Sequence, residues 1–63
     1  MSKYSCFFVD GADRFNGVEP VEAATDIAAL TYAKQLLRRE REAKAVEVWI
    51  LGNMVGRVDR ERS

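Results

Sequence analysis

The sequence contains no histidine and only one cysteine, Cys6. Without histidine, the usual general base of a hydrolytic triad is missing, and one thiolate cannot build a zinc site. A disulfide within the chain is excluded because it needs two cysteines. Since Cys6 lies in the middle of a predicted strand, we expect a buried thiol and not a nucleophile. These absences predict a protein that is not an enzyme and holds no cofactor.

Long apolar runs are also absent. The aromatic run at residues 4–9 ends at Asp10, far short of the ~20 apolar residues that a membrane span needs. One unpaired cysteine is typical of a reducing compartment. We therefore expect a cytoplasmic protein that does not associate with membranes.

An excess of positive charge is missing as well, because ten basic residues balance ten acidic ones. In the C-terminal half, acidic residues interleave with the arginines, which is typical of solvated ion pairs. A nucleic-acid partner is therefore not favoured, although a regulator that binds nucleic acid stays an alternative. The arginines concerned are Arg38, Arg39, Arg41, Arg57, Arg60 and Arg62.

What the sequence does contain is enough apolar material for one small domain. Its 63 residues are 48% hydrophobic, and we assign all of residues 1–63 to a single domain. A chain of this length buries only ~60% of the surface that its unfolded form exposes. With disulfides excluded and metals unsupported, self-association is the expected source of further stability.

Two elements stand out before the C-terminal hairpin. Residues 3–9 are rich in aromatic and β-favouring side chains on both faces, which predicts a strand that is covered on both sides. Residues 25–42 have helical periodicity, with Thr25 as the cap and Asp26 at the positive end of the helix dipole. Between them, residues 14–18 form either a short returning strand or part of a loop.

Four polar side chains recur at a spacing of three residues in that intervening segment. Their spacing differs from that of a calcium loop, and such residues are common in turns. We therefore predict turn residues and no metal site here. The four are Asp10, Asp13, Asn16 and Glu19.

The stretch VEVWILGNMVGRV, residues 46–58, predicts a hairpin with two alternative registers. A two-residue turn at Gly52 and Asn53 pairs Trp49 with Gly56. A three-residue loop pairs Val48 with Val58 and leaves Trp49 on the opposite face. A shift of one residue moves every side chain of a strand across the sheet, so the sequence leaves the position of Trp49 open.

The resulting fold class is α+β, with the order β-α-β-β. One helix packs on an antiparallel-rich sheet of three strands, or four if residues 14–18 pair. We expect the core to contain Val46, Val48, Ile50, Leu30, Ala33 and Leu37.

Either register leaves apolar side chains on both faces of the sheet, and one helix covers only one of them. An uncovered apolar face of that size predicts a homo-oligomer, with a dimer favoured. The alternative is a monomer in which residues 10–21 fold over the face. The residues expected on this face are Phe7, Trp49, Val55 and Arg57.

Two family resemblances accompany these patterns. The aromatic strand at residues 4–9, the segment Gly17-Val18-Glu19, the alanine-rich helix and the strand Val46-Glu47-Val48 resemble a group of small, mostly alphaproteobacterial proteins of unknown function. That resemblance implies a fold and no activity. The β-α-β-β order with Trp49 after the helix also resembles dodecins, which implies a flavin stacked on Trp49. This chain differs in its longer acidic loop before the helix.

Together these features predict a self-associating, non-enzymatic module that binds protein through an uncovered sheet face. The partner is a second copy or another protein. A flavin or small-ligand carrier and an antitoxin-like or nucleic-acid-binding regulator are the alternatives.

Overall fold

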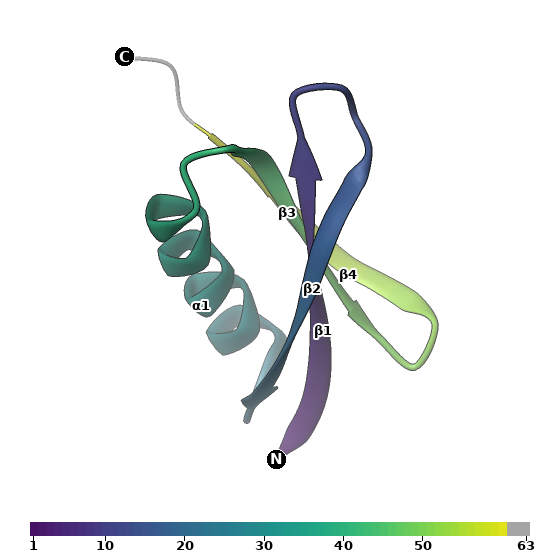
Figure 1. Cartoon of the computed structure of the whole chain (residues 1–63). Helices are drawn as coiled ribbons and strands as arrows, with labels where there is room; N and C mark the ends of the chain where they lie inside the picture. Colours follow the sequence, from purple (N-terminus) through teal and green to yellow (C-terminus); the bar gives the residue numbers. More distant parts are fainter. Residues whose placement is uncertain (61–63) are drawn as a thin grey trace.

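The computed structural model describes residues 1–60 and places one helix against one face of a four-stranded sheet (Figure 1). The elements follow the chain in the order β1 (Ser2–Asp10), β2 (Phe15–Ala23), α1 (Asp26–Arg39), β3 (Ala43–Ile50) and β4 (Asn53–Asp59). The strand order in the sheet is β2-β1-β3-β4, and every neighbouring pair is antiparallel. The α+β class is confirmed, and the fourth strand that the sequence left open is present.

β1 lies in the middle of the sheet, as its two apolar faces require. Its Tyr4 and Cys6 are buried beneath α1, and β2 returns along its outer side with Tyr4 opposite Val21. β2 runs well beyond the short strand considered at residues 14–18, and it includes Pro20. The segment therefore extends the sheet at its edge and does not fold over the face.

Four residues, 11–14, connect β1 to β2. Asp10 accepts hydrogen bonds from the backbone N–H groups of Ala12 (2.9 Å) and Arg14 (3.0 Å). Asp13 has φ of 63°, the left-handed residue that such a loop needs before the returning strand. Asp10 and Asp13 thus form the turn as predicted, whereas the prediction for Asn16 and Glu19 is wrong, because both lie in β2.

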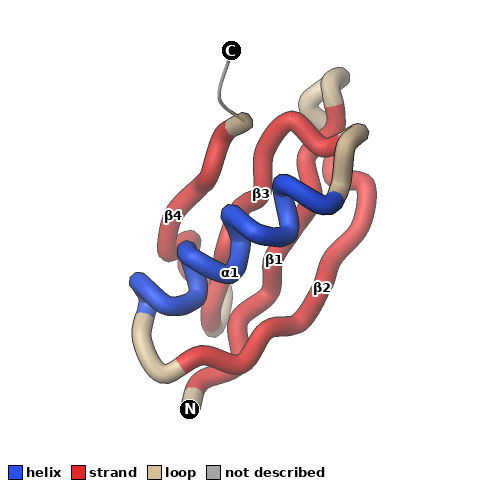
Figure 2. Tube along the Cα trace, turned by 90° about the vertical axis from the view of Figure 1, so that its left-hand side faces the viewer, coloured by secondary structure: helices blue, strands red, loops and turns tan. Residues whose placement is uncertain are grey.

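α1 begins where the sequence predicts. The hydroxyl of Thr25 accepts a hydrogen bond from the backbone N–H of Ala28 at 3.1 Å, and Asp26 occupies the first turn. The helix ends at Arg39, three residues earlier than expected, because Glu40 is already extended and the chain must reverse into β3. The helix runs obliquely across the strands, on one side of the sheet only (Figure 2).

The β3–β4 hairpin has neither of the two predicted registers. Its turn consists of Leu51 and Gly52, both with positive φ (50° and 80°), so that Ile50 pairs with Asn53. These angles are close to those of a type I′ turn, in which glycine is favoured at the second position. The dipeptide Gly52-Asn53 suggested a turn one residue later in the chain.

A bulge at Val55 then shifts the register of the hairpin by one residue. Trp49 lies opposite Met54, whereas Val48 lies opposite Gly56 and Val46 opposite Val58. A bulge places two residues of one strand against one of its partner, which changes the face that the following residues occupy.

The hydrophobic core lies between α1 and the sheet. The predicted core residues all belong to it: Val46, Val48, Ala33 and Leu37 are buried, and Leu30 and Ile50 pack against them. Buried alanines on α1 allow the helix to approach the sheet closely.

Arg60, directly after β4, joins the end of the sheet to the C-terminal end of α1. Its guanidinium donates hydrogen bonds to the carbonyl oxygens of Leu37 (2.8 Å), Glu40 (2.6 Å) and Ala43 (2.8 Å). The last carbonyls of a helix have no partner within the helix, and a cation is favoured at that end of its dipole. Arg60 satisfies both requirements.

Candidate interaction surface

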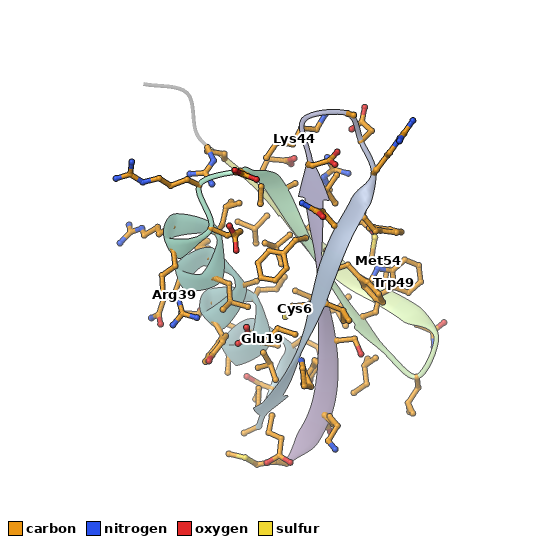
Figure 3. The ribbon with its side chains drawn as sticks, viewed as in Figure 1. Cys6, Glu19, Arg39, Lys44, Trp49 and Met54 are labelled. Carbon is orange, nitrogen blue, oxygen red and sulfur yellow. The ribbon has the colours of Figure 1, made fainter. Side chains whose placement is uncertain are left out.

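The sheet face opposite α1, called the open face below, carries an apolar strip to which every strand contributes one large side chain. Phe15 comes from β2, Phe7 from β1, Trp49 from β3 and Met54 from β4. Trp49 and Met54 are direct cross-strand partners and lie together on the side of the sheet away from α1 (Figure 3). The strip therefore crosses the whole width of the sheet.

Phe7 is the centre of this strip. Its ring lies 5.2 Å from the ring of Phe15, with 42° between the planes, and 6.4 Å from that of Trp49, at 89°. Tilted and perpendicular arrangements at these separations are the favoured ones for aromatic pairs. Val18, the cross-strand partner of Phe7 on β2, continues the strip and is 55% exposed.

The strip leaves much apolar surface accessible. Phe15 is 60% exposed and Met54 is 47% exposed, whereas Phe7 and Trp49 are half-buried. Beside them, Val9 and Ala45 are buried although neither belongs to the core under α1. The side chains of the open face thus form a packed layer of their own.

A charged group borders this layer and fixes the indole of Trp49. Glu47 accepts a hydrogen bond from Nε1 of Trp49 at 3.2 Å and another from the guanidinium of Arg57 at 3.1 Å. Arg57 also donates from Nε to the carboxylate of Asp59 at 3.0 Å. Asp59, through this hydrogen bond, and Glu47 raise the pKa of Arg57 above its ordinary value. The indole N–H and the charges are therefore paired within one chain.

Three of the four residues predicted for this surface are on it. Phe7, Trp49 and Arg57 share the open face, whereas Val55 packs against the core on the helix side. The expectation for Val55 is wrong because the bulge at that position interrupts the alternation of β4. Phe15 and Met54 were not predicted. A strand that includes Phe15 would have indicated that Phe15 belongs to the sheet. Placing Met54 on the open face requires the correct hairpin register.

The remaining candidates are engaged elsewhere. Cys6 is fully buried, and burial, followed by the negative charge of Glu19, raises the pKa of its thiol. A raised pKa disfavours the thiolate that a nucleophile needs. Asp13 forms an ion pair with Lys44, whose hydrogen bond lowers the pKa of that carboxyl. Within residues 1–60, no three acidic or cysteine side chains lie close enough to hold a metal ion.

The arginines do not form one patch. Arg57 lies on the open face, Arg60 binds backbone carbonyls, and Arg38 and Arg39 project from the last turn of α1. Arg41 follows the helix, and Arg62 lies outside the described residues.

A separate groove of about 350 Å³ lies between α1 and the end of β4. It is lined by Lys34, Leu37, Arg38, Val58, Asp59 and Arg60.

No family model, curated protein or solved structure matches this chain. Among the described residues, no helix is long and apolar enough to cross a membrane.

Proposed function

We propose that this protein is a self-associating, non-enzymatic module of the cytoplasm, and that the open face of one copy packs against the open face of a second copy. The observation that carries the proposal is the apolar strip, in which Phe15 and Met54 are about half exposed or more. Monomeric proteins rarely leave a contiguous aromatic surface of this kind in water. Burial against an equivalent surface removes it from water for both copies at once.

The dimensions of the molecule leave room for an interface of dimer size. Its two longer dimensions are 32 and 22 Å. They limit the open face to at most about 700 Å², which is of the same order as the ~800 Å² per partner of a stable interface. A chain of 63 residues has much to gain from such burial, because its own core is small.

The charges of the open face also suit a second copy. Glu47, Arg57 and Asp59 neutralise one another in part through hydrogen bonds within the chain. Two such faces approach without the repulsion that a face of one sign produces. The same balance disfavours a polyanion such as nucleic acid, whose affinity depends on many unpaired cations.

A flavin stacked on Trp49, as the dodecin resemblance implies, is the competing proposal for the same surface. The indole of Trp49 is exposed in part and its orientation is fixed by Glu47 and Phe7, so it offers a flat ring. A yellow purified protein with flavin absorbance supports that proposal over a dimer of bare faces.

Tryptophan fluorescence tests self-association directly, because Trp49 is the only tryptophan and lies on the open face. We expect its emission to shift to longer wavelength on dilution as two faces separate. Phe15→Lys places a charge on the face and is expected to give the shifted emission at every concentration. Ile27→Lys is the matched control, since Ile27 is 76% exposed on α1.

Circular dichroism of both variants establishes that they are folded. Emission that does not change with concentration, in the wild type and in Phe15→Lys alike, contradicts a face-to-face dimer. If the emission changes only when another protein is added, that protein and not a second copy binds the open face.

A further inference from the structure

The groove between α1 and β4 combines an apolar floor with a cationic rim. Leu37 is buried and Val58 half-buried, and they form the floor. Lys34 and Arg38 lie one turn apart on α1 at the rim, and both are exposed. Arg60 closes one end by reaching across to the carbonyl of Leu37 at 2.8 Å. The groove is on the helix side and at the edge of the sheet, away from the strip on the open face.

Within residues 1–60, the strand beside this groove pairs with another strand on one side only. β4 is at one edge of the sheet, next to β3 alone (Figure 2). The N–H of Arg60 donates to the carbonyl of Lys44 at 2.9 Å, and Val58 lies opposite Val46. Antiparallel strands alternate between groups that face the partner and groups that face away. The N–H and C=O groups of Arg57 and Asp59 therefore point outward, away from β3.

The other edge of the sheet is protected. β2 contains Pro20, which has no N–H to donate, and it carries two carboxylates nearby, Glu19 directly before the proline and Glu22 two residues after it. Proline and charge are the usual means by which an edge strand avoids pairing. β4 has no proline, and its bulge lies at Val55, so the ladder beside the groove is regular. Of the two edge strands, only β4 lacks a proline.

The charge of the groove indicates the kind of strand that fits. Within residues 1–60, neither Lys34 nor Arg38 forms an ion pair. The carboxylate of Asp59 is already bound by Arg57 at 3.0 Å. Among residues 1–60, the cations of the rim thus exceed the anions available to them, which favours a partner with carboxylates.

We infer that an extended peptide with acidic side chains adds to β4 as a fifth strand. Its backbone pairs with the outward groups of Arg57 and Asp59, as in strand addition to other exposed sheet edges. Alternate side chains of an added strand point to the helix side, where carboxylates meet Lys34 and Arg38. This partner surface is separate from the open face and does not depend on dimerisation.

The probe is a short fluorescein-labelled peptide of alternating valine and glutamate, titrated with the full chain at low ionic strength. Fluorescence anisotropy gives its affinity, and a peptide with lysine in place of glutamate is the comparison. We expect the glutamate peptide to bind about tenfold more tightly or better, because charge complementarity decides between them. N-methylation of its backbone amides is expected to abolish binding, and backbone NMR signals of Arg57 and Asp59 are expected to shift.

Variants locate the site. Lys34→Glu with Arg38→Glu is expected to weaken binding of the glutamate peptide about tenfold or more. Arg14→Glu with Arg39→Glu makes the same change of charge outside the groove and is expected to have a much smaller effect. Met54→Lys alters the open face and is expected to leave peptide affinity unchanged.

Equal affinities for the two peptides overturn the inference, as does unchanged binding in the Lys34/Arg38 variant. NMR shifts confined to the open face overturn it as well. The backbone NMR signals of Arg57 and Asp59 can also shift with protein concentration when no peptide is present. That result means that the β4 edge binds a second copy of the chain instead.

Discussion

The rings of Trp49 and Phe7 stand perpendicular to each other on the open face, with their centroids 6.4 Å apart and their planes at 89°. They come from adjacent strands, β3 and β1, and α1 lies on the other side of the sheet (Figure 1). The hydrogen bond from Trp49 to Glu47 fixes the indole further. Side chains that are ordered before binding lose little entropy when a partner arrives. The pair is thus suited to a preformed interface.

Val55 and Met54 are neighbours in sequence and lie on opposite faces of the sheet. Met54 lies on the open face, and Val55, at the bulge, packs against the core. Val55→Lys is expected to lower the free energy of unfolding by roughly 1–3 kcal/mol, because it places a charge against the core. Met54→Lys is expected to change it by less than about 0.5 kcal/mol. Chemical denaturation at low protein concentration measures both. Equal losses in the two variants contradict the bulge.

Arg60 is expected to contribute to stability through its carbonyl contacts. Arg60→Ala removes the donor shared by Leu37, Glu40 and Ala43, and we expect a loss of roughly 1–2 kcal/mol in the free energy of unfolding. Arg60→Lys keeps the charge but not the planar fork, so an intermediate loss is expected. Arg39→Ala, at the same helix end, is the control. If Arg60→Ala is no less stable than Arg39→Ala, Arg60 does not cap the helix.

Leu51 is an unfavourable residue for its turn. It is 92% exposed and has φ of 50°, a conformation that costs a non-glycine residue about 1–2 kcal/mol. Asparagine tolerates this conformation, and Asn-Gly is the preferred type I′ pair. Leu51→Asn is therefore expected to raise the free energy of unfolding by roughly 1 kcal/mol. Leu51→Ala keeps the strain and is expected to show no such gain; equal stability of the two variants rules out strain at Leu51.

Tyr4 is expected to make stability depend on alkaline pH. Its hydroxyl donates to the carboxylate of Asp26 at 2.7 Å, and this bond, with burial, raises the pKa of Tyr4 above 10.0. A group whose pKa is higher in the folded state stabilises that state fully below its unfolded pKa. The contribution is lost as the pH rises through the folded pKa. Stability should therefore fall above about pH 10.

Denaturation midpoints across that pH range test this expectation. Tyr4→Phe is expected to lose part of the alkaline fall, whereas Tyr32→Phe, at an exposed position of α1, is expected to keep it. If stability falls equally at alkaline pH in the wild type and in both variants, groups other than Tyr4 cause the fall.

The sequence predicts the elements better than their pairing. Thr25 and the apolar stripe through Leu37 predict α1 because both are local signals. Residues 14–18 alone give only a weak strand signal, because a turn dipeptide, Asn16-Gly17, lies among them. β2 also contains Pro20, which is uncommon in strands and is tolerated here only at an edge. The hairpin register depends on a positive φ at Leu51 and on a bulge at Val55. The residue types at these positions indicate neither feature. Leucine is disfavoured at a positive φ, and valine is common in regular strands.

The candidate surface was predictable to the same extent. Phe7 and Trp49 alternate with the core residues of their own strands, but the sequence left the face of Trp49 open because two hairpin registers were compatible with it. Met54 is on that face only because of the bulge, and Phe15 only because β2 pairs with β1 through a second irregularity near Val9. Both depend on contacts between distant segments.

The solution mass tests the central claim most directly. Light scattering behind a sizing column, repeated over a wide range of dilution, is expected to give twice the 7.1 kDa of one chain, falling towards 7.1 kDa at the lowest concentrations. Met54→Lys is expected to remain at the lower mass throughout. A wild-type mass of 7.1 kDa at every concentration contradicts the account, because the open face is then exposed to water in a stable monomer.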